Sequence, residues 1–485
     1  ENLVDWNLSR SRFWGIPIPI WKTENGDDEI CISSIEELKI EIEKSIALGV
    51  MTSNPLANFE AGNMSEENYN ILDLHRPYVD DIILVSKDGR PMKRELDLID
   101  VWFDSGAMPY AQLHYPFENK NLFEKNYPAD FIAEGVDQTR GWFFTLHAIS
   151  TLLFDSIAYK NVISNGLVLD KNGNKMSKRL GNAVDPFSII DKYGADATRW
   201  YMVSNAQPWD NLKFDEAGIS EVQRKFFGTL YNTYSFFALY ANIDEFSYSE
   251  KTIPINDRIE LDRWILSELN TLINQVEESY EAYDPTSIAR KTQDFVINKL
   301  SNWHVRLSRR RFWKGEYDSD KIAAYQTLYE CLETIAIIAA PIAPFFMDKL
   351  FQDLNVIGKK NSSFSVHLTN FPPSNPLVIN TTLERRMGLA QNVTSLALSL
   401  RKKERIRVRQ PLQKIMIPTL NDKTKKDIES VSTIIKNELN VKEIVFFSDN
   451  SNILKKQIKP NFKTLGPKFG KEMKLIASKI AQFSE

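Results

Sequence analysis

The chain has 485 residues, a length that favours two to four domains rather than one. Its composition, 43% apolar and 26% charged, is that of a globular protein and excludes a disordered or fibrous one. The net charge is only −4, so any nucleic-acid surface must come from local basic patches. The only cysteines, Cys31 and Cys331, lie far apart, which excludes a disulfide framework and a Cys-x-x-Cys zinc site and fits a reduced, cytoplasmic setting.

Two further features bear on the class of protein. The longest apolar stretch, 335–347, is interrupted by Pro341 and Pro344 and is too short to span a bilayer, so we expect no membrane segment. The sequence opens on Glu1, and its first residues resemble the middle of a fold. We therefore expect an excised piece of a longer protein.

Residues 1–215 mix short apolar runs with helical patterns, as α/β domains do. Residues 130–135, 139–154 and 161–170 are typical of a strand, a helix and a strand, which predicts a parallel βαβ unit. The ligand crevice of such a unit lies at the carboxyl ends of its strands. Residues 22–98 look like an insertion that contains a helix and has no readable role.

The rest of the chain is predicted to be helical and then mixed. Residues 216–375 carry apolar side chains at three- and four-residue spacing, which indicates a helix bundle, with a break at Asp284-Pro285-Thr286. Residues 376–485 combine a basic helix over 385–410 with strand-like KIMIP and EIVFF and a final helix. The predicted fold class is α/β plus all-α.

The stretch NGNKMSKRLGN (172–182) places Lys175, Lys178 and Arg179 on a glycine-bounded loop directly after a predicted strand. Mobile lysines and the donor fork of an arginine suit polyphosphate oxygens. The alternative is a solvated basic turn, and charge alone does not decide between the two. No Gly-x-x-x-x-Gly-Lys-Ser/Thr motif occurs, so the usual phosphate cradle is absent from the sequence.

A second polar cluster follows the strand predicted at 130–135. Glu134, Asp137 and Gln138 come where the strand gives way to a helix, and the glycine between them, Gly135, permits close approach. Acceptors there can hold an ammonium group or ribose hydroxyls, although capping of the helix by Asp137 is a simpler explanation. Two tryptophans are candidates either for an apolar pocket or for the core: Trp102 and Trp142.

Four motifs together resemble the class I aminoacyl-tRNA synthetases, and among them the isoleucyl family: NLSRSRFWGIPIPIW, DVWFDSG, AEGVDQTRGWF and NGLVLDKNGNKMSKR. The last contains the Lys-Met-Ser-Lys-Ser/Arg signature. Valyl and leucyl members look different in the second and third motifs and are the alternative. The resemblance covers essentially the whole chain. It implies the second half of a Rossmann-like catalytic domain, a helix-bundle anticodon-binding domain and a small mixed tRNA-binding subdomain.

The resemblance also implies a reaction in two steps. Isoleucine attacks ATP to form isoleucyl-adenylate, and tRNA(Ile) then accepts the acyl group. Magnesium would arrive with ATP, and the zinc of some members has no support in two isolated cysteines. The full-length enzyme would be a monomer.

Residue roles follow from the same resemblance. Lys175 and Lys178 would contact the ATP phosphates. Trp102 and Trp142 would form part of the isoleucine pocket. Contacts to ATP and the adenylate are implied for Glu134, Gly135, Asp137, Gln138, Met176, Ser177 and Arg179.

Two basic stretches are candidates for tRNA binding. In 301–314, arginines and Lys314 accompany aromatic residues, a combination that suits phosphate contacts and base stacking. The tryptophans could equally face the bundle core while the arginines are solvated. The stretch 401–410 suits contact with the RNA backbone rather than with bases. The candidates are Trp303, Arg306, Arg309, Arg310, Arg311, Trp313, Lys402 and Arg405.

One motif of the family is missing from this sequence. Class I enzymes carry a His-x-Gly-His motif in the first half of the nucleotide fold, and none of the five histidines here is paired in that way. The editing domain of the family is absent as well. We therefore expect a carboxyl-side portion of a synthetase that is catalytically incomplete alone. A non-catalytic RNA-binding module is the alternative from another class.

Overall fold

A computed structural model describes residues 5–313, 316–358, 360, 362–418, 421–447 and 460–481. The chain divides into two compact units, Glu1–Ala183 with Ala206–Phe214 and Val184–Asn205 with Asp215–Glu485. Both α/β and helical parts are present, as the predicted fold class requires. None of the described helices has the length and apolar character needed to cross a membrane.

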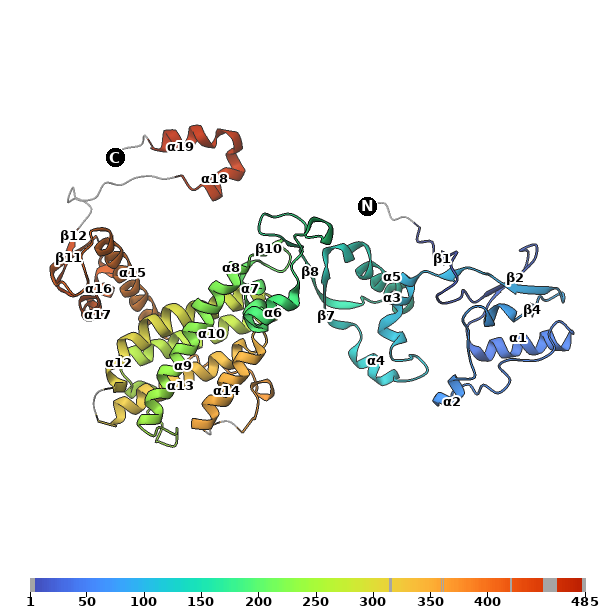
Figure 1. Cartoon of the computed structure of the whole chain (residues 1–485), viewed down its shortest axis with the longest axis horizontal. Helices are drawn as coiled ribbons and strands as arrows, with labels where there is room; N and C mark the ends of the chain where they lie inside the picture. Colours follow the sequence, from blue (N-terminus) through green and yellow to red (C-terminus); the bar gives the residue numbers. More distant parts are fainter. Residues whose placement is uncertain are drawn as a thin grey trace. The chain divides into compact units, whose positions relative to one another are not determined.

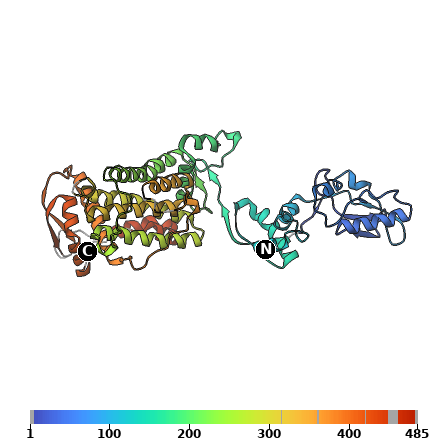
Figure 2. The same cartoon turned by 90° about the horizontal axis from the view of Figure 1, so that it is seen from below.

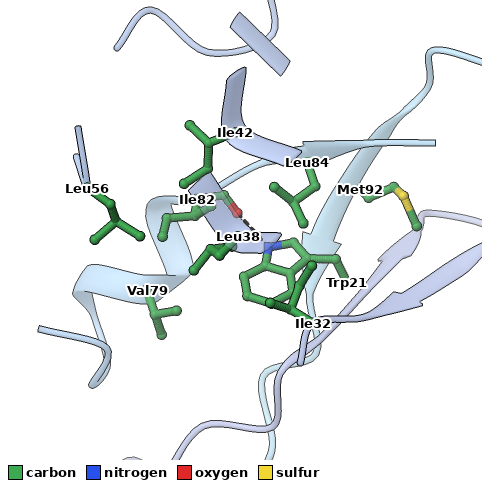
Figure 3. Packing of buried hydrophobic residues seen from close by; sticks show 9 residues of the cluster. All are labelled: Trp21, Ile32, Leu38, Ile42, Leu56, Val79, Ile82, Leu84 and Met92. Atoms are coloured by element: carbon green, nitrogen blue, oxygen red, sulfur yellow. Dashed lines mark hydrogen bonds between the residues drawn. The ribbon is translucent and has the colours of Figure 1, made fainter. Parts of the chain in front are cut away.

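The segment predicted as an insertion has a core of its own within the first unit. Its antiparallel sheet has the strand order β3 (Glu29–Cys31), β2 (Ile20–Thr23), β5 (Pro91–Arg94) and β4 (Leu84–Val85). The predicted helix is α1 (Ile35–Ala47), which packs on β4. Nine buried side chains fill the space between them, and the indole Nε1 of Trp21 donates a 2.8 Å hydrogen bond to the carbonyl of Ile82 (Figure 3). Burial of each large apolar side chain contributes roughly 1.5–3 kcal/mol, so this core explains why a largely polar segment folds.

Most strands and helices in this first part of the chain are short. The elements are β1 (Ser9–Arg10), β2 (Ile20–Thr23), β3 (Glu29–Cys31), α2 (Glu66–Tyr69), η1 (Tyr78–Asp81), β4 (Leu84–Val85), β5 (Pro91–Arg94) and β6 (Leu98–Ile99). Strands β1 and β6 pair antiparallel and so bring the two ends of the segment together.

The predicted parallel βαβ unit is present. Strand β7 (Ala129–Gly135) pairs in parallel with β8 (Tyr159–Asn165), and α5 (Trp142–Phe154) connects them (Figure 1). The first residues of the expected helix instead form the 3₁₀ turn η2 (Val136–Arg140). Helix α3 (Val101–Ala111) packs closely on α5. The remaining elements of the unit are α4 (Lys120–Asn126), β9 (Val168–Leu169), η3 (Lys178–Leu180) and β10 (Leu212–Lys213).

The second unit is a helix bundle, and its long helices lie side by side in both views (Figures 1 and 2). The predicted break at Asp284 is confirmed, because its carboxylate accepts the Ser287 amide at 3.0 Å and Pro285 opens the next helix. The elements are α8 (Glu216–Val222), η4 (Gln223–Phe227), α9 (Gly228–Ile243), η5 (Ile255–Asp257), α10 (Glu260–Glu281), α11 (Pro285–Asp294), η6 (Phe295–Val305), α12 (Arg306–Trp313), α13 (Ser319–Ala339), α14 (Pro344–Gly358) and η7 (Val366–Leu368).

Two helices before residue 215 belong to this bundle, α6 (Pro186–Tyr193) and α7 (Ala195–Asn205). The fully buried Trp200 stacks on Phe226, with ring centroids 4.1 Å apart. The carboxylate of Asp196 accepts the Phe346 amide at 2.6 Å. Residues 184–205 therefore pack with the helical unit, whereas residues 206–214 group with the first unit.

The last part of the chain joins a long helix to a two-stranded parallel sheet. The predicted strands are present as β11 (Leu412–Pro418) and β12 (Val441–Phe447). The basic helix, α15 (Thr381–Lys403), ends before the predicted 410, because Arg405 adopts a left-handed backbone with φ of 57°. The other helices are α16 (Asp422–Ser430), α17 (Ser432–Leu439), α18 (Phe462–Phe469) and α19 (Met473–Ala481).

Candidate active site

The lysine-rich stretch forms a compact loop directly after β9. Leu169 bridges to Lys175 in antiparallel fashion, and Gly173 makes the turn with φ of 89°, a conformation that favours glycine. Ser177 then caps η3, since its Oγ accepts the Leu180 amide at 3.2 Å. The loop thus has defined local structure at both ends, and the half-buried Met176 lies between them.

The cationic side chains of this loop are exposed. Lys175, Lys178 and Arg179 form no ion pair or hydrogen bond through their side chains with any residue that the structure describes. Their positive charge is therefore not neutralised by the protein. Such a group of cations on ordered backbone suits an anionic ligand, and polyphosphate is the one that lysine and arginine bind well.

Two side chains that sequence reasoning did not select hold this loop, Asp170 and Asn182. Hydrogen bonds, first from the backbone of Asn174 and then from the side chain of Asn182, lower the pKa of Asp170 to about 2. The sequence does contain a signal for them, because Asp and Asn within a Gly-containing turn commonly bond to nearby backbone amides.

The second cluster lies at the carboxyl end of β7. Glu134 and Gly135 pair with β8 residues through the backbone, and the half-buried Glu134 carboxylate has no hydrogen-bond partner within the described part of the chain. The Asp137 carboxylate accepts a hydrogen bond from the side-chain Nε2 of Gln138 at 3.1 Å. The Oε1 of Gln138 accepts one from the Trp142 backbone amide at 2.9 Å. Gln138, rather than Asp137, caps the helix, which leaves the exposed Asp137 carboxylate oriented by one neighbour only.

The two candidate tryptophans differ in their surroundings. The indole of Trp142 donates to the Ser105 carbonyl at 2.8 Å and is half-buried, so it ties α5 to α3. Trp102 is 42% exposed, and its ring edge lies against Gly141, where an added Cβ would come within 3.1 Å. Trp102 therefore presents an open apolar surface beside the polar cluster.

Two carboxylates that the sequence did not single out lie at the start of α3, Asp100 as its N-cap and Asp104 in its first turn. Asp100 is buried and accepts from the indole of Trp6 at 2.9 Å and from Arg10 at 2.6 Å. Burial, and secondarily the nearby Asp100, raises the pKa of Asp104. Asp100 thereby fastens the first described residues to α3, close to Trp102.

The lysine loop follows β9, which pairs in parallel with β10, whereas the second cluster follows β7, which pairs in parallel with β8. No hydrogen bond or ion pair joins the two groups among the described residues. Within the same residues, no group of three or more His, Cys, Asp and Glu side chains is arranged to hold a metal ion. The candidate site therefore consists of two separate polar groups on different strand pairs.

The first candidate stretch for RNA divides between core and surface. Trp303 is 4% exposed and packs in the bundle. Both terminal nitrogens of Arg311 donate hydrogen bonds to the carboxylate of the buried Asp262 at 2.8 Å. These two residues are thus engaged inside the bundle and are not available to RNA in this structure. The residues left at the surface are Arg306, Arg309, Arg310 and Trp313. Lys314 lies outside the described residues.

The second stretch follows the end of α15. Arg401, not selected from the sequence as a contact, is buried and donates to the carbonyls of Arg407, Gln410 and Leu439 at 2.7–3.1 Å. Lys402 and Arg405 are exposed. Arg401 therefore shapes the turn that presents the other basic side chains to solvent.

Comparisons with known proteins agree with these features. Residues 1–215 match the family model described as tRNA synthetases class I (I, L, M and V), and residues 262–416 match that of the anticodon-binding domain of tRNA ligase. A LeuRS–tRNA–LeuAMS ternary complex from Agrobacterium radiobacter K84 has a similar fold, with a TM-score of 0.52 and 20% identity over 78% of this chain and 43% of that chain.

Over residues 1–215 the chain is therefore similar to the class I aminoacyl-tRNA synthetases. Within that family it is similar to isoleucine–tRNA ligases: 63% identical to that of Bacteroides fragilis strain YCH46 over 100% of this chain, 62% to that of Cytophaga hutchinsonii over 99% and 45% to that of Clostridium novyi over 100%. These alignments confirm the isoleucyl resemblance over the valyl and leucyl alternatives. The chain spans 42–44% of the length of these curated relatives.

Proposed function

We propose that this chain is part of an isoleucine–tRNA ligase, which activates isoleucine with ATP and transfers it to tRNA(Ile). One observation carries the proposal. Lys175 and Lys178 stand exposed on an ordered loop, without ion-pair partners among the described residues, in a sequence 63% identical to isoleucine–tRNA ligases.

The proposed chemistry has two steps. The carboxylate of isoleucine attacks the α-phosphorus of ATP, the bond to the bridging oxygen breaks, and pyrophosphate leaves. Lys178 and Lys175 stabilise the negative charge that develops on the leaving pyrophosphate, with magnesium arriving on ATP. A terminal ribose hydroxyl of tRNA then attacks the carbonyl carbon of the adenylate and releases AMP.

The group at the end of β7 would hold the adenylate. Glu134 offers an unpaired carboxylate among the described residues, and Asp137 and Gln138 offer further acceptors. The glycine between them, Gly135, lets a ligand approach the backbone. Trp102 and Trp142 would form part of the isoleucine pocket. Met176, Ser177 and Arg179 would complete the ATP contacts of the loop.

For tRNA, the proposal is confined to exposed residues. Arginines near an exposed tryptophan suit phosphate contact with base stacking, and the turn after α15 suits phosphate contact alone. The residues proposed are Arg306, Arg309, Arg310, Trp313, Lys402 and Arg405.

Calorimetric titration of the chain with magnesium pyrophosphate at low ionic strength tests the phosphate role. We expect binding, and we expect Lys178→Ala to weaken it about tenfold, because a charge-assisted hydrogen bond is lost. The matched control is Lys160→Ala, which removes the same charge from an exposed ion pair with Asp130 on β8 and β7. Equal losses in the two variants would contradict the role of Lys178. A chain that bound tRNA but no pyrophosphate would favour a non-catalytic RNA-binding module.

A further inference from the structure

The carboxylate of Asp170 organises the turn at the start of the lysine loop. Its Oδ1 accepts the backbone amides of Asn172 at 2.9 Å and Asn174 at 2.8 Å. Its Oδ2 accepts the side-chain amides of Asn182 at 3.1 Å and Asn174 at 3.3 Å. One side chain before the loop is thus joined to a side chain at the far end of the loop.

Asn182 completes the connection from the other side. Its Oδ1 accepts the Ser177 backbone amide at 2.9 Å, and its Nδ2 also donates to the Lys175 carbonyl at 3.2 Å. The backbone is therefore fixed at Lys175 and immediately before Lys178. Both lysines are held by their main chain, while their side chains stay free of any partner that the structure describes.

The charge arrangement is informative because Asp170 pairs with none of the lysines or the arginine of residues 171–179. An acidic residue in a basic loop can neutralise a neighbouring lysine through an ion pair. Here the lone pairs of the carboxylate are occupied by amides, so Lys175, Lys178 and Arg179 keep their charge. A carboxylate used in this way orders the loop without reducing its attraction for an anion.

We propose that Asp170 and Asn182 are positioning residues that latch residues 172–182 in one conformation, so that Lys175 and Lys178 meet a polyphosphate group on backbone that is already ordered. This inference rests on the proposed phosphate role of the loop. Ordering before binding removes part of the entropy cost of binding and raises affinity without an added contact.

The protonation state of the latch agrees with this role. Hydrogen bonds from the Asn174 backbone and the Asn182 side chain lower the pKa of Asp170 to about 2, below its model-peptide value. Because the pKa of Asp170 is depressed in the ordered loop, ionised Asp170 stabilises the ordered loop at pH values above the ordinary carboxyl pKa. This stabilisation is lost only as the pH falls toward 2. The latch is therefore ionised and intact at neutral pH.

Limited trypsin digestion of the chain tests the latch, because Lys175, Lys178 and Arg179 are trypsin sites inside it. In Asp170→Asn, an amide that donates would face the Nδ2 of Asn182. In Asn182→Asp, two carboxylates would face each other. We expect cleavage within the loop about tenfold faster in either variant, since two or three hydrogen bonds are lost.

The reciprocal double variant D170N/N182D restores one donor facing one acceptor and keeps the net charge of the original pair. We expect its cleavage rate to return to within about threefold of the unsubstituted chain, as coupled pairs do in double-mutant cycles. Asp130→Asn is the control for charge, because this exposed residue on β7 pairs only with Lys160 among the described residues. It should leave loop cleavage unchanged.

The affinity for magnesium pyrophosphate provides the second readout. We expect about fivefold weaker binding in each single variant and recovery in the double variant, with loop order as the cause. Single variants cleaved at the original rate, or a double variant as impaired as both singles, would overturn the latch. Altered cleavage with unchanged pyrophosphate affinity would overturn its positioning role. No pyrophosphate binding by the unsubstituted chain would refute the proposed phosphate role itself, while the cleavage rates still decide whether the latch exists.

Discussion

Asp262, in the first turn of α10, is fully buried and accepts hydrogen bonds from His304 at 2.9 Å and from Arg311 at 2.8 Å. Burial alone would raise the pKa of this carboxyl, but the hydrogen bonds from His304 and Arg311 outweigh it and hold the pKa below its usual range. Arg311 also pairs with Asp320 at the start of α13. One carboxylate thus joins three helical segments of the bundle.

We expect Asp262→Asn to destabilise the bundle by about 3–5 kcal/mol, because it leaves a buried cation with only its more exposed partner. Denaturant unfolding measures this loss as a lower midpoint at unchanged slope. Asp353→Asn, which breaks the surface pair with Lys349, should cost about 0.5 kcal/mol or less. Similar shifts of the unfolding midpoint in both variants would contradict a larger contribution of the buried ion pair to stability.

At the scale of single residues, the sequence predicted which side chains could bind a ligand better than it predicted whether each side chain is buried or exposed. The exposed cations of the lysine loop were selected because charge and the motif point to the same partner. Asp170 and Asn182 were not selected, because their role appears only when the loop closes and brings residues twelve positions apart within 3.1 Å. Trp303 and Trp313 look alike in the sequence, yet one is buried and the other is 48% exposed.

Some side chains of helix α12 face the bundle and others face solvent, and its sequence does not reveal which. Phe312 and Arg311 turn toward the bundle, whereas Arg309 and Arg310 are exposed and have no ion-pair partner within the described residues. Arginine has an apolar stem and a charged head, so it fits either face of an amphipathic helix. The pattern of apolar residues therefore left the orientation of this segment open.

Replacing Arg309 and Arg310 by alanine should weaken tRNA binding and flatten its dependence on salt. Each lost phosphate contact lowers the slope of log K against log salt by about one unit. Filter binding across a series of salt concentrations gives both quantities. Lys225→Ala with Lys349→Ala is the control, since it removes two exposed cations that already pair with carboxylates. A salt slope unchanged by the arginine substitutions would contradict their phosphate role.

Among whole elements, those with strong local signals were predicted. The βαβ unit and the break at Asp284 follow from periodicity and capping chemistry, and the structure contains both. The sheet in 22–98 was not predicted, because its strands are two to four residues long and give no clear alternation. Its core depends on contacts between distant segments, such as that of Trp21 with Ile82.

For the whole molecule, the division into two units depends on packing that no sequence pattern marks. Helix α7 follows the lysine loop in sequence but buries Trp200 among the helices of the bundle. The order of catalytic and anticodon-binding regions, in contrast, follows from the motifs and agrees with both family matches.

The chain lacks one motif that the synthetases of this class use to hold ATP. The 485 residues contain no His-x-Gly-His motif, so we expect the chain alone to supply only part of the contacts that ATP needs. The lysine loop would then be one side of a phosphate clamp. Its charge and its latch would then support pyrophosphate binding by the chain alone, whereas the reaction of ATP with isoleucine requires the other side.

Isoleucine-dependent exchange between ATP and pyrophosphate tests the central claim most directly. We expect the full-length protein to catalyse exchange only with isoleucine present, and we expect Lys178→Ala to lower it about 100-fold, because a donor to the developing charge is removed. The 485-residue chain alone should show no exchange above background. Ordinary exchange by the chain alone, or full exchange by the full-length Lys178→Ala variant, would contradict the account.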